Sequence, residues 1–582
     1  MSDFSHLRKN LKKDYSKFTE IKVAVLGDSA TQLLVTALKG QAYENQLNLD
    51  VFEADYDQIP LQINNSSSDF HAFQSDYALI FQSSQKLLSQ FNKTEIGRRK
   101  YWAEIQVNQI KEYYDKIKSH SSKTRLIVFN LPIVNDSIFG NYSNKVEISF
   151  SFQLRKFNYL LSVLSVDLTD IHICDLASMQ SNLGLEKFLN TSMYYNNSMV
   201  LSLDVLPIVA KNTLDIISAG EGKFKKCLIL DLDNTMWGGV IGDDGVENIQ
   251  IGSLGIGSAF SELQTWAKEL NNRGIILAVC SKNTESIAKE PFETHPDMVL
   301  RLYDFAVFVA NWENKADNIR YIQRVLNIGF DSMVFLDDNP FERNIVRENL
   351  PDVTVPELPE DPVEYLTYLR GQNLFETMSF SFEDKERTKK YQVEAKRVEI
   401  KEKHTDEESF LRSLEMKCAV ANFTTFNIPR VAQLTQRSNQ FNLRTKRYSE
   451  EEIQRIQKSE NHIGLAFSLE DKFGDYGLIS VVILEKRNHN ELFIDTWLMS
   501  CRVLKRGVEK FVLSTIVEQA NELDIKLISG EYIPTVKNDL VRNHFSDLEF
   551  KSHDFDLWSL NLNEFSDKQT FIQKQQNDER FN

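Results

Sequence analysis

The stretch Lys226-Cys-Leu-Ile-Leu-Asp231-Leu-Asp233-Asn-Thr235-Met-Trp-Gly-Gly239 decides the fold of the middle of this chain. Its apolar run, Cys227 to Leu230, predicts a buried strand that ends in two carboxylates, Asp231 and Asp233. Ligands of a parallel α/β sheet bind beyond the carboxyl ends of its strands, so these acids are expected to face a cleft. Two carboxylates there repel each other unless a hard cation such as Mg2+ neutralises them. The alternative is a strand end with two solvated acids.

Three later elements carry further polar residues at their ends, in a fixed order. They are a strand over 275–279 that leads to Ser281, a helix start at Lys315, and a strand over 333–336 that ends in Asp337-Asp338. This order of Asp-x-Asp, Ser, Lys and Asp-Asp resembles the four-motif signature of the haloacid dehalogenase (HAD) phosphohydrolase superfamily.

The HAD resemblance implies a chemical role for each motif residue. Asp231 is the implied nucleophile, which takes up a phosphoryl group. Asp233 is the implied general acid and base. Ser281 and Lys315 would hold the phosphoryl oxygens and balance their charge. The implied Mg2+ ligands are the carboxylates Asp231, Asp233, Asp337 and Asp338.

The residues around these motifs indicate a particular subfamily. The segments 231–245, 278–283, 295–301, 311–316 and 334–343 are similar to those of FkbH-like proteins, subfamily IIIC of the HAD superfamily. Such proteins take a glyceryl unit from 1,3-bisphosphoglycerate, release phosphate, and load the unit as a thioester onto acyl carrier protein. The resemblance therefore implies a small phosphorylated substrate and a carrier-protein partner.

Cys280 stands directly before Ser281, and two interpretations of it remain open. A cysteine that ends an apolar strand is commonly a small buried residue. Alternatively, Lys282, Lys315 and the metal would lower the pKa of its thiol, and Cys280 would relay the acyl group to the carrier.

Length and charge bound the possible functions. The chain has 582 residues, which favours three domains, and a net charge of −16. That charge argues against a nucleic-acid binder or a binder of anionic membranes. Its five cysteines form no Cys-x-x-Cys pair, which fits a reducing cytoplasm. The polar N-terminus has no signal-peptide core, and no apolar run is long enough to span a bilayer.

The first domain, expected over 1–220, alternates strands and helices. The predicted strands are 21–26, 49–52, 77–81, 125–130 and 171–175, and the predicted helices are 98–118 and 149–166. This pattern predicts a doubly wound α/β domain. Gly27-Asp28-Ser29 and Asn130 resemble the first and third sequence blocks of SGNH hydrolases, in which the serine is the nucleophile. Because no late Asp-x-x-His follows, we expect an SGNH-like fold with no working triad, and Ser29 as a helix cap.

The HAD domain is expected over 221–365, with a Rossmann-like sheet and a minimal cap. HAD enzymes often carry a cap domain between motifs, but the gaps 236–257 and 284–304 are too short for a large one. An open site suits a substrate that is carried on a bulky partner such as an acyl carrier protein.

A charged helical linker is expected over 366–416, followed by a domain over 417–582. Predicted strands at 478–484, 492–499 and 526–529 and a helix at 507–523 give this last domain an α/β character. The turn before the helix resembles the pyrophosphate loop of GNAT acetyltransferases, although Lys505 replaces its first glycine. The resemblance implies a site for acyl-CoA or for phosphopantetheine, and the implied cofactor-binding residues are Arg502, Arg506, Gly507 and Asn538. An active acyltransferase and a docking domain both remain open.

Three functional hypotheses follow from these patterns. The leading one is a Mg2+-dependent HAD enzyme that also transfers an acyl group to a carrier thiol. The second is a plain phosphatase that uses the same residues. The third is a non-catalytic scaffold that brings a carrier protein and its partners together.

Overall fold

The computed structural model describes residues 3–380, 391–392, 407–438, 440–487, 490–500, 503–535, 537–554, 556–566 and 570–575. The chain divides into two compact units, Met1–Glu221 and Gly222–Asn582. Both units combine helices with sheets that contain parallel strands, which confirms the predicted α/β class. Among the described residues, no helix has the length and apolar character needed to cross a membrane.

The first unit is built on a five-stranded parallel sheet in the order β2-β1-β3-β4-β5. Its strands are β1 (Thr19–Gly27), β2 (Leu47–Glu53), β3 (Tyr77–Phe81), β4 (Arg125–Phe129) and β5 (Ile171–Cys174). All five predicted strands are therefore present, with ends that differ by one or two residues. They form because buried apolar residues dominate each run.

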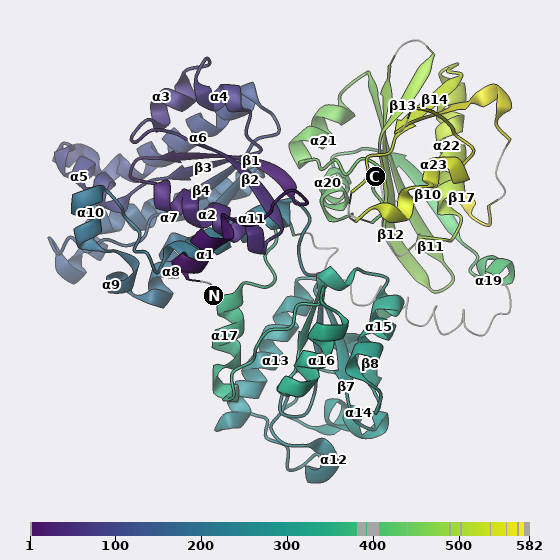
Figure 1. The fold of residues 1–582 in the computed structure, drawn as a ribbon, viewed down its shortest axis with the longest axis horizontal. Helices are drawn as coiled ribbons and strands as arrows, with labels where there is room; N and C mark the ends of the chain where they lie inside the picture. The colour runs from purple at the N-terminus through teal and green to yellow at the C-terminus, as the bar shows by residue number, and fades with distance from the viewer. Residues whose placement is uncertain are drawn as a thin grey trace. The chain divides into compact units, whose positions relative to one another are not determined.

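Helices cover both faces of this sheet (Figure 1). One face packs against α1 (Phe4–Asn10), α2 (Gln32–Glu44), α8 (Leu176–Leu183), α9 (Leu185–Phe188), α10 (Thr191–Asn197) and α11 (Leu206–Gly220). The other packs against α3 (Ile59–Asn64), α4 (Asp69–Phe73), α5 (Ser84–Lys93), α6 (Trp102–His120) and α7 (Phe150–Asp167). Alternate residues of β1 supply the two cores: Val23 and Val25 enter one, and Ala24 and Leu26 the other.

The second unit begins with a four-stranded parallel sheet in the order β8-β7-β6-β9. Its strands are β6 (Cys227–Leu230), β7 (Ile276–Ser281), β8 (Phe305–Ala310) and β9 (Met333–Leu336). One face packs against α13 (Ile256–Asn272), α14 (Glu285–Thr294) and α17 (Tyr365–Gln372). The other packs against α15 (Lys315–Leu326) and α16 (Pro340–Asn349).

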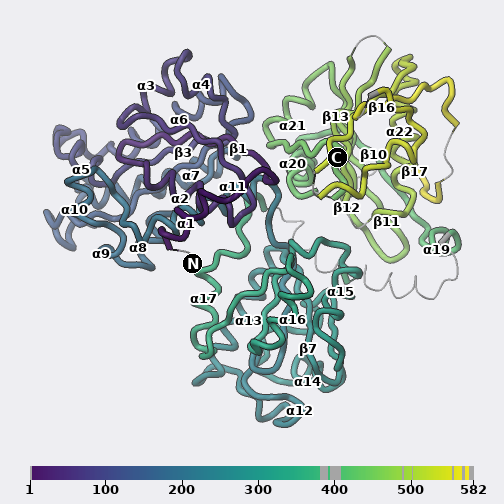
Figure 2. Tube along the Cα trace, viewed as in Figure 1, coloured from purple at the N-terminus to yellow at the C-terminus, as the bar shows by residue number. Residues whose placement is uncertain are grey.

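The connections at the carboxyl end of this sheet are short. Between β6 and α13 the chain forms only the one-turn helix α12 (Ile241–Asp244) and two isolated bridges, Asp233 with Trp237 and Gly238 with Gln250. Between β7 and β8 it forms α14 and a single 3-10 turn. Residues 231–304 are all described, and they contain no inserted domain (Figure 2).

The segment after residue 365 is more than a linker. Leu369 and Phe375 are buried in the same core as α13. Residues 381–390 and 393–406, which are part of the predicted charged linker, lie outside the described residues.

An eight-stranded sheet completes the second unit, in the order β15-β16-β14-β13-β12-β11-β10-β17. Its strands are β10 (Lys417–Asn422), β11 (His462–Asp471), β12 (Gly474–Lys486), β13 (Glu491–Met499), β14 (Leu527–Glu531), β15 (Lys551–Asp554), β16 (Leu557–Asn561) and β17 (Gln573–Gln575). The helices are α19 (Glu407–Ser413), α20 (Ile428–Arg437), α21 (Glu450–Gln457), α22 (Val508–Glu522) and α23 (His544–Asp547). The predicted strands and helix correspond to β12, β13, β14 and α22.

Candidate active site

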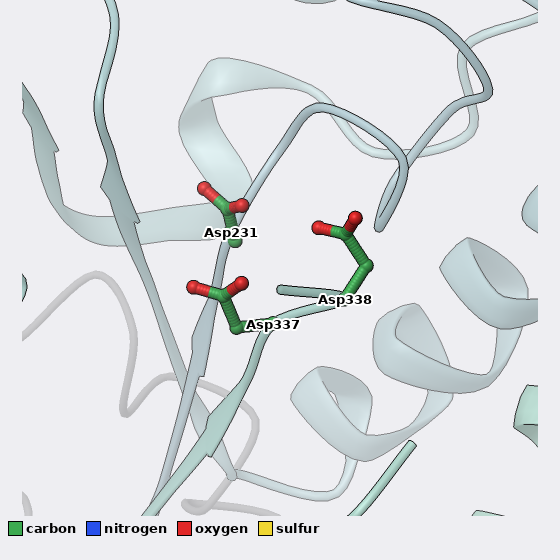
Figure 3. Close-up of side chains that lie close together, drawn as sticks. All are labelled: Asp231, Asp337 and Asp338. Atoms are coloured by element: carbon green, nitrogen blue, oxygen red, sulfur yellow. The ribbon is translucent and has the colours of Figure 1, made fainter. Parts of the chain in front are cut away.

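Three carboxylates meet at the carboxyl end of the second unit's parallel sheet. Asp231 follows β6, and Asp337 and Asp338 follow β9, its neighbour in the sheet. One oxygen from each lies within 4.8 Å of the other two. Figure 3 shows these side chains at adjacent strand ends. The parallel register creates the group, because it pairs Leu230 with Leu336, the residues before Asp231 and Asp337.

Lys315 joins two of these carboxylates. Its ammonium lies 3.0 Å from Asp231 Oδ1 and 2.5 Å from Asp337 Oδ2, and the residue is only 3% exposed. Lys315 is the first residue of α15, where the Asn314 side chain caps the helix. Burial alone would lower the pKa of the Lys315 ammonium, but Asp231 and Asp337 outweigh it and raise that pKa.

The three carboxylates outnumber the Lys315 ammonium that contacts two of them. Burial, and then the Asp231 carboxylate, raise the pKa of both Asp337 and Asp338. One ammonium therefore leaves repulsion in the group, which a second cation would relieve. Carboxylate oxygens are the ligands that Mg2+ prefers, so the donor set fits the predicted ion.

Asp233 is held apart from the three-carboxylate group. Its Oδ1 accepts hydrogen bonds from Trp237 Nε1 and the Ile241 amide, each at 3.0 Å, and its Oδ2 accepts one from Asn283 Nδ2 at 3.1 Å. Burial raises the pKa of Asp233, although the Ile241 and Trp237 donors lower it in part. These bonds suit a proton-transferring side chain better than a side-chain metal ligand.

Sequence reasoning missed the residues that position this site. Trp237 and Asn283 hold Asp233, while Thr235 Oγ1 accepts the Asp338 amide at 3.1 Å. Arg343 Nη1 donates to the backbone oxygens of Asp337, at 2.9 Å, and Asp338, at 2.6 Å. The sequence signal that could have identified these residues is their position, since each lies within a few residues of a motif.

Ser281 and Cys280 end β7, next to β6, but they differ in their surroundings. Cys280 is 0% exposed and belongs to the core beneath α15 and α16. Its Sγ donates to the Lys315 backbone oxygen at 3.7 Å. Burial raises the pKa of the thiol and Lys315 offsets this only in part, which favours the interpretation of Cys280 as a small buried residue. Ser281 is also buried, as the last residue of the strand.

Of the four residues predicted to bind a cofactor in the last domain, the structure describes Arg506, Gly507 and Asn538. Arg502 lies outside the described residues. Arg506 is buried and donates to Tyr476 Oη. Gly507 is the N-cap of α22 with φ +78°, and Lys505 adopts φ +62°, so the backbone takes a left-handed turn there despite the lysine.

The side chains of Glu509 and Asn538 both take part in hydrogen bonds within the protein. Glu509 Oε1, in the first turn of α22, accepts the Lys505 amide at 3.4 Å. Asn538 is 0% exposed and donates to the backbone oxygens of Asn442 and Ile533, each at 2.9 Å. Its Oδ1 accepts the Thr535 amide at 2.7 Å. Asn538 therefore ties loops together.

In the first unit, the expectation that Ser29 caps a helix is wrong. The N-cap of α2 is Thr31, and its hydroxyl donates to Glu53 at 2.6 Å instead of capping the helix. Asn130 Nδ2 donates to Asp175 Oδ1 at 2.7 Å, and its Oδ1 accepts the Ala177 amide at 3.0 Å. His172 lies within β5, where burial lowers its pKa to about 4.

Comparison with known proteins identifies the family to which this fold and its carboxylate group belong. Residues 22–218 match the FkbH N-terminal domain. A crystal structure of the N-terminal part of BF1531 from Bacteroides fragilis, which contains a phosphatase domain complexed with Mg, is 53% identical with a TM-score of 0.63. It covers 65% of this chain, and this chain covers all 100% of it. The chain therefore belongs to the family of BF1531.

Two further structures resemble a quarter of the chain. The ribosomal-protein-S18-alanine N-acetyltransferase from Escherichia coli is 12% identical, with coverage of 25% of this chain and 94% of its own. The GNAT domain of PAT from S. lividans is 17% identical, with coverage of 25% and 89%. Both have a TM-score of 0.20, which is too low to identify a fold. No curated protein matches the chain.

Proposed function

We propose that this protein is a Mg2+-dependent phosphohydrolase that uses Asp231 as its nucleophile. The observation that carries this proposal is the group of Asp231, Asp337 and Asp338 with the buried Lys315 ammonium between two of them. The Mg-complexed phosphatase domain of the 53% identical BF1531 fragment supports the same conclusion.

The residues of this chain divide the chemistry between them. An Asp231 oxygen attacks the phosphorus, and the bond from phosphorus to the leaving oxygen breaks. Asp233 donates a proton to that oxygen and then takes one from the water that releases phosphate from Asp231. Lys315 balances charge on the phosphoryl oxygens, with Ser281 beside it. Mg2+, held by Asp231, Asp337 and Asp338, would supply further stabilisation of that charge.

We further propose a substrate of the 1,3-bisphosphoglycerate type and an acyl carrier protein as partner. Asp231 would remove the phosphate ester, and the carrier thiol would attack the acyl phosphate carbonyl, which forms the thioester and expels the second phosphate. The FkbH-like motifs support this step. The short connections across residues 231–304 support it too, because they leave room for a bulky carrier.

Intact-mass spectrometry and phosphate release test the two steps separately. Wild-type protein with Mg2+ and 1,3-bisphosphoglycerate is expected to release phosphate, and a holo acyl carrier protein added to it should gain a glyceryl group. Asp231→Asn should abolish hydrolysis of the phosphate ester with the fold intact. Full activity of D231N would refute the nucleophile.

The second candidate is a plain phosphatase on a small phosphorylated metabolite. The burial of Cys280 favours it over an acyl relay through that thiol, since a thiol in the core has no access to an acyl group. Phosphate release without a mass gain on either protein would select this candidate. The scaffold hypothesis would require that Mg2+ does not bind at all.

The last domain enters the proposal only as a docking site for the carrier's phosphopantetheine arm. Glu509 already occupies the first turn of α22, so a pyrophosphate would meet a carboxylate there. Retention of radiolabelled acyl-CoA by the purified protein would contradict this assignment.

A further inference from the structure

A second lysine stands at the carboxyl end of β7, directly after Ser281. The Lys282 ammonium donates to Glu342 Oε1 at 2.6 Å. Lys282 follows β7, and Glu342 lies in the first turn of α16, which follows β9. In the sheet order β8-β7-β6-β9, the strand between β7 and β9 is β6, which leads into Asp231. The ion pair therefore joins the two segments that flank the proposed nucleophile.

Glu342 belongs to the same electrostatic neighbourhood as the three-carboxylate group. Besides the main effect of burial, the Glu342 carboxylate raises the pKa of the Cys280 thiol. Asp231 and Asp337 raise the same pKa, so all three carboxylates act on one sulfur atom. Arg343, the residue after Glu342, donates to the Asp337 backbone oxygen at 2.9 Å. The start of α16 is therefore fixed against the loop that carries the candidate metal ligands.

The two members of the ion pair differ in exposure. The Glu342 side chain is 9% exposed, and its Oε2 has no hydrogen-bond partner among the described residues. The Lys282 side chain is 35% exposed. An ammonium has three donors, and within the described part of the chain Lys282 uses one of them, on Glu342. A buried carboxylate thus holds a half-buried ammonium that keeps two donors for a ligand.

Lys315 is not placed to serve two anionic groups. It is 3% exposed, and its ammonium already contacts Asp231 and Asp337. In the proposed reaction it balances the charge of the phosphoryl group that Asp231 attacks. A substrate with a second phosphoryl group requires another cation, and a lysine binds phosphate as a point charge. Lys282, next to Ser281, is the cation that the structure offers for this task.

We propose that Lys282 is a specificity-determining residue that binds the second phosphoryl group of a three-carbon bisphosphate, and that Glu342 is the positioning residue that holds it. This inference rests on the proposed hydrolase site. It names the side chain by which that site selects a substrate with two phosphoryl groups over a substrate with one. Lys282 has no part in breaking the bond from phosphorus to oxygen, so its effect is on binding.

Isothermal titration calorimetry on the full chain with Mg2+ tests this assignment. The protein carries Asp231→Asn, so that neither probe is consumed. The probes are propane-1,3-diyl bisphosphate and sn-glycerol 3-phosphate, which differ in the second phosphoryl group. We expect Lys282→Met to raise the Kd of the bisphosphate about tenfold or more, as for the loss of one charge-assisted hydrogen bond. The Kd of glycerol 3-phosphate should stay within about twofold, because its single phosphoryl group does not reach Lys282.

Two further lysine variants serve as controls. Lys282→Arg keeps the positive charge and should retain most of the preference for the bisphosphate. Lys289→Met is the matched control, since Lys289 is 34% exposed and pairs with Glu285 within α14. It should change the Kd of neither probe.

Glu342→Gln separates ligand binding from a purely structural ion pair. Both K282M and E342Q break the pair, so a structural role predicts that they act alike. The proposal predicts different effects, because E342Q keeps an acceptor for Lys282 and removes a negative charge that opposes phosphate. The Kd of the bisphosphate should therefore stay within about twofold in E342Q or fall. The double variant K282M/E342Q leaves no unpaired buried carboxylate, and it should show the weakening of K282M with an intact thermal melt.

Several results would overturn the proposal. They are an equal bisphosphate Kd with and without Lys282, a similar weakening in K282M and E342Q, an equal weakening of both probes, and no binding of the bisphosphate to the parent. Phosphate release from sn-glycerol 3-phosphate by the wild-type protein is measured in parallel. No release, together with a preference for the bisphosphate that depends on Lys282, would refute the hydrolase and support the binding site.

Discussion

Asn283→Ala would remove one hydrogen bond from Asp233 without touching the three-carboxylate group. Asn283 Nδ2 lies 3.1 Å from Asp233 Oδ2, whereas the Trp237 and Ile241 donors both contact Oδ1. Asn283 thus fixes the second oxygen and with it the rotation of the carboxyl group. Asp233 is expected to give a proton to the leaving group, and that transfer depends on this orientation.

The size of the effect follows from the kind of bond. A hydrogen bond to a charged group contributes about 1.5–3 kcal/mol. If this is lost from the transition state alone, kcat falls by roughly 10- to 150-fold. KM and the Mg2+ concentration for half-maximal activity should stay within about twofold, because Asn283 contacts neither Lys315 nor the carboxylate group.

The assay is steady-state phosphate release from a phosphate monoester such as sn-glycerol 3-phosphate, across a Mg2+ titration. Asn272→Ala is the control, since it removes an exposed amide that donates to Glu269 on α13. Asn283 Oδ1 also accepts the Thr284 amide at 2.9 Å, so each variant is first checked by thermal melting. A kcat for N283A within threefold of N272A would refute the role of Asn283, and a rise in KM alone would assign it to substrate binding.

Three other variants give independent tests. Lys315→Met leaves buried Asp231 and Asp337 without their ammonium, so we expect a loss of about 3–5 kcal/mol in the free energy of unfolding. Denaturant titrations measure this loss, and Mg2+ should restore part of it. Equal stability with and without Lys315 would contradict the ion pairs. Cys280→Ser should keep phosphate release within about threefold, as the thiol lies in the core, and a complete loss with an intact melt would revive the relay. Burial lowers the pKa of His544 to about 3, so the unfolded chain binds more protons below pH 6.5, and acidification to pH 5 should cost the last domain about 2 kcal/mol. His544→Phe should abolish that dependence, and an unchanged pH profile in H544F would show that another group causes it.

The predicted strand ends agree with the structure closely in the two parallel sheets. Runs such as Cys227–Leu230 and Tyr77–Phe81 are continuously apolar and end at polar residues, so the pattern leaves little freedom. The last domain was predicted less completely, since β10, β11 and the strands after β14 were missed. Their residues mix polar and apolar side chains, and β11 also contains register shifts that break a simple alternation.

The sequence by itself determined the order of the motifs and which strand end each occupies, because strand formation depends on local apolar runs. Only the tertiary structure decided which side chains meet. The register of β6 against β9 brings Asp231 to Asp337, and Lys315 reaches both from α15. Cys280, in β7, packs into the core beneath α15 and α16. Hydrogen bonds from Trp237 and Asn283 hold Asp233 apart from the three-carboxylate group. These choices depend on contacts between segments far apart in the chain, which a local pattern does not encode.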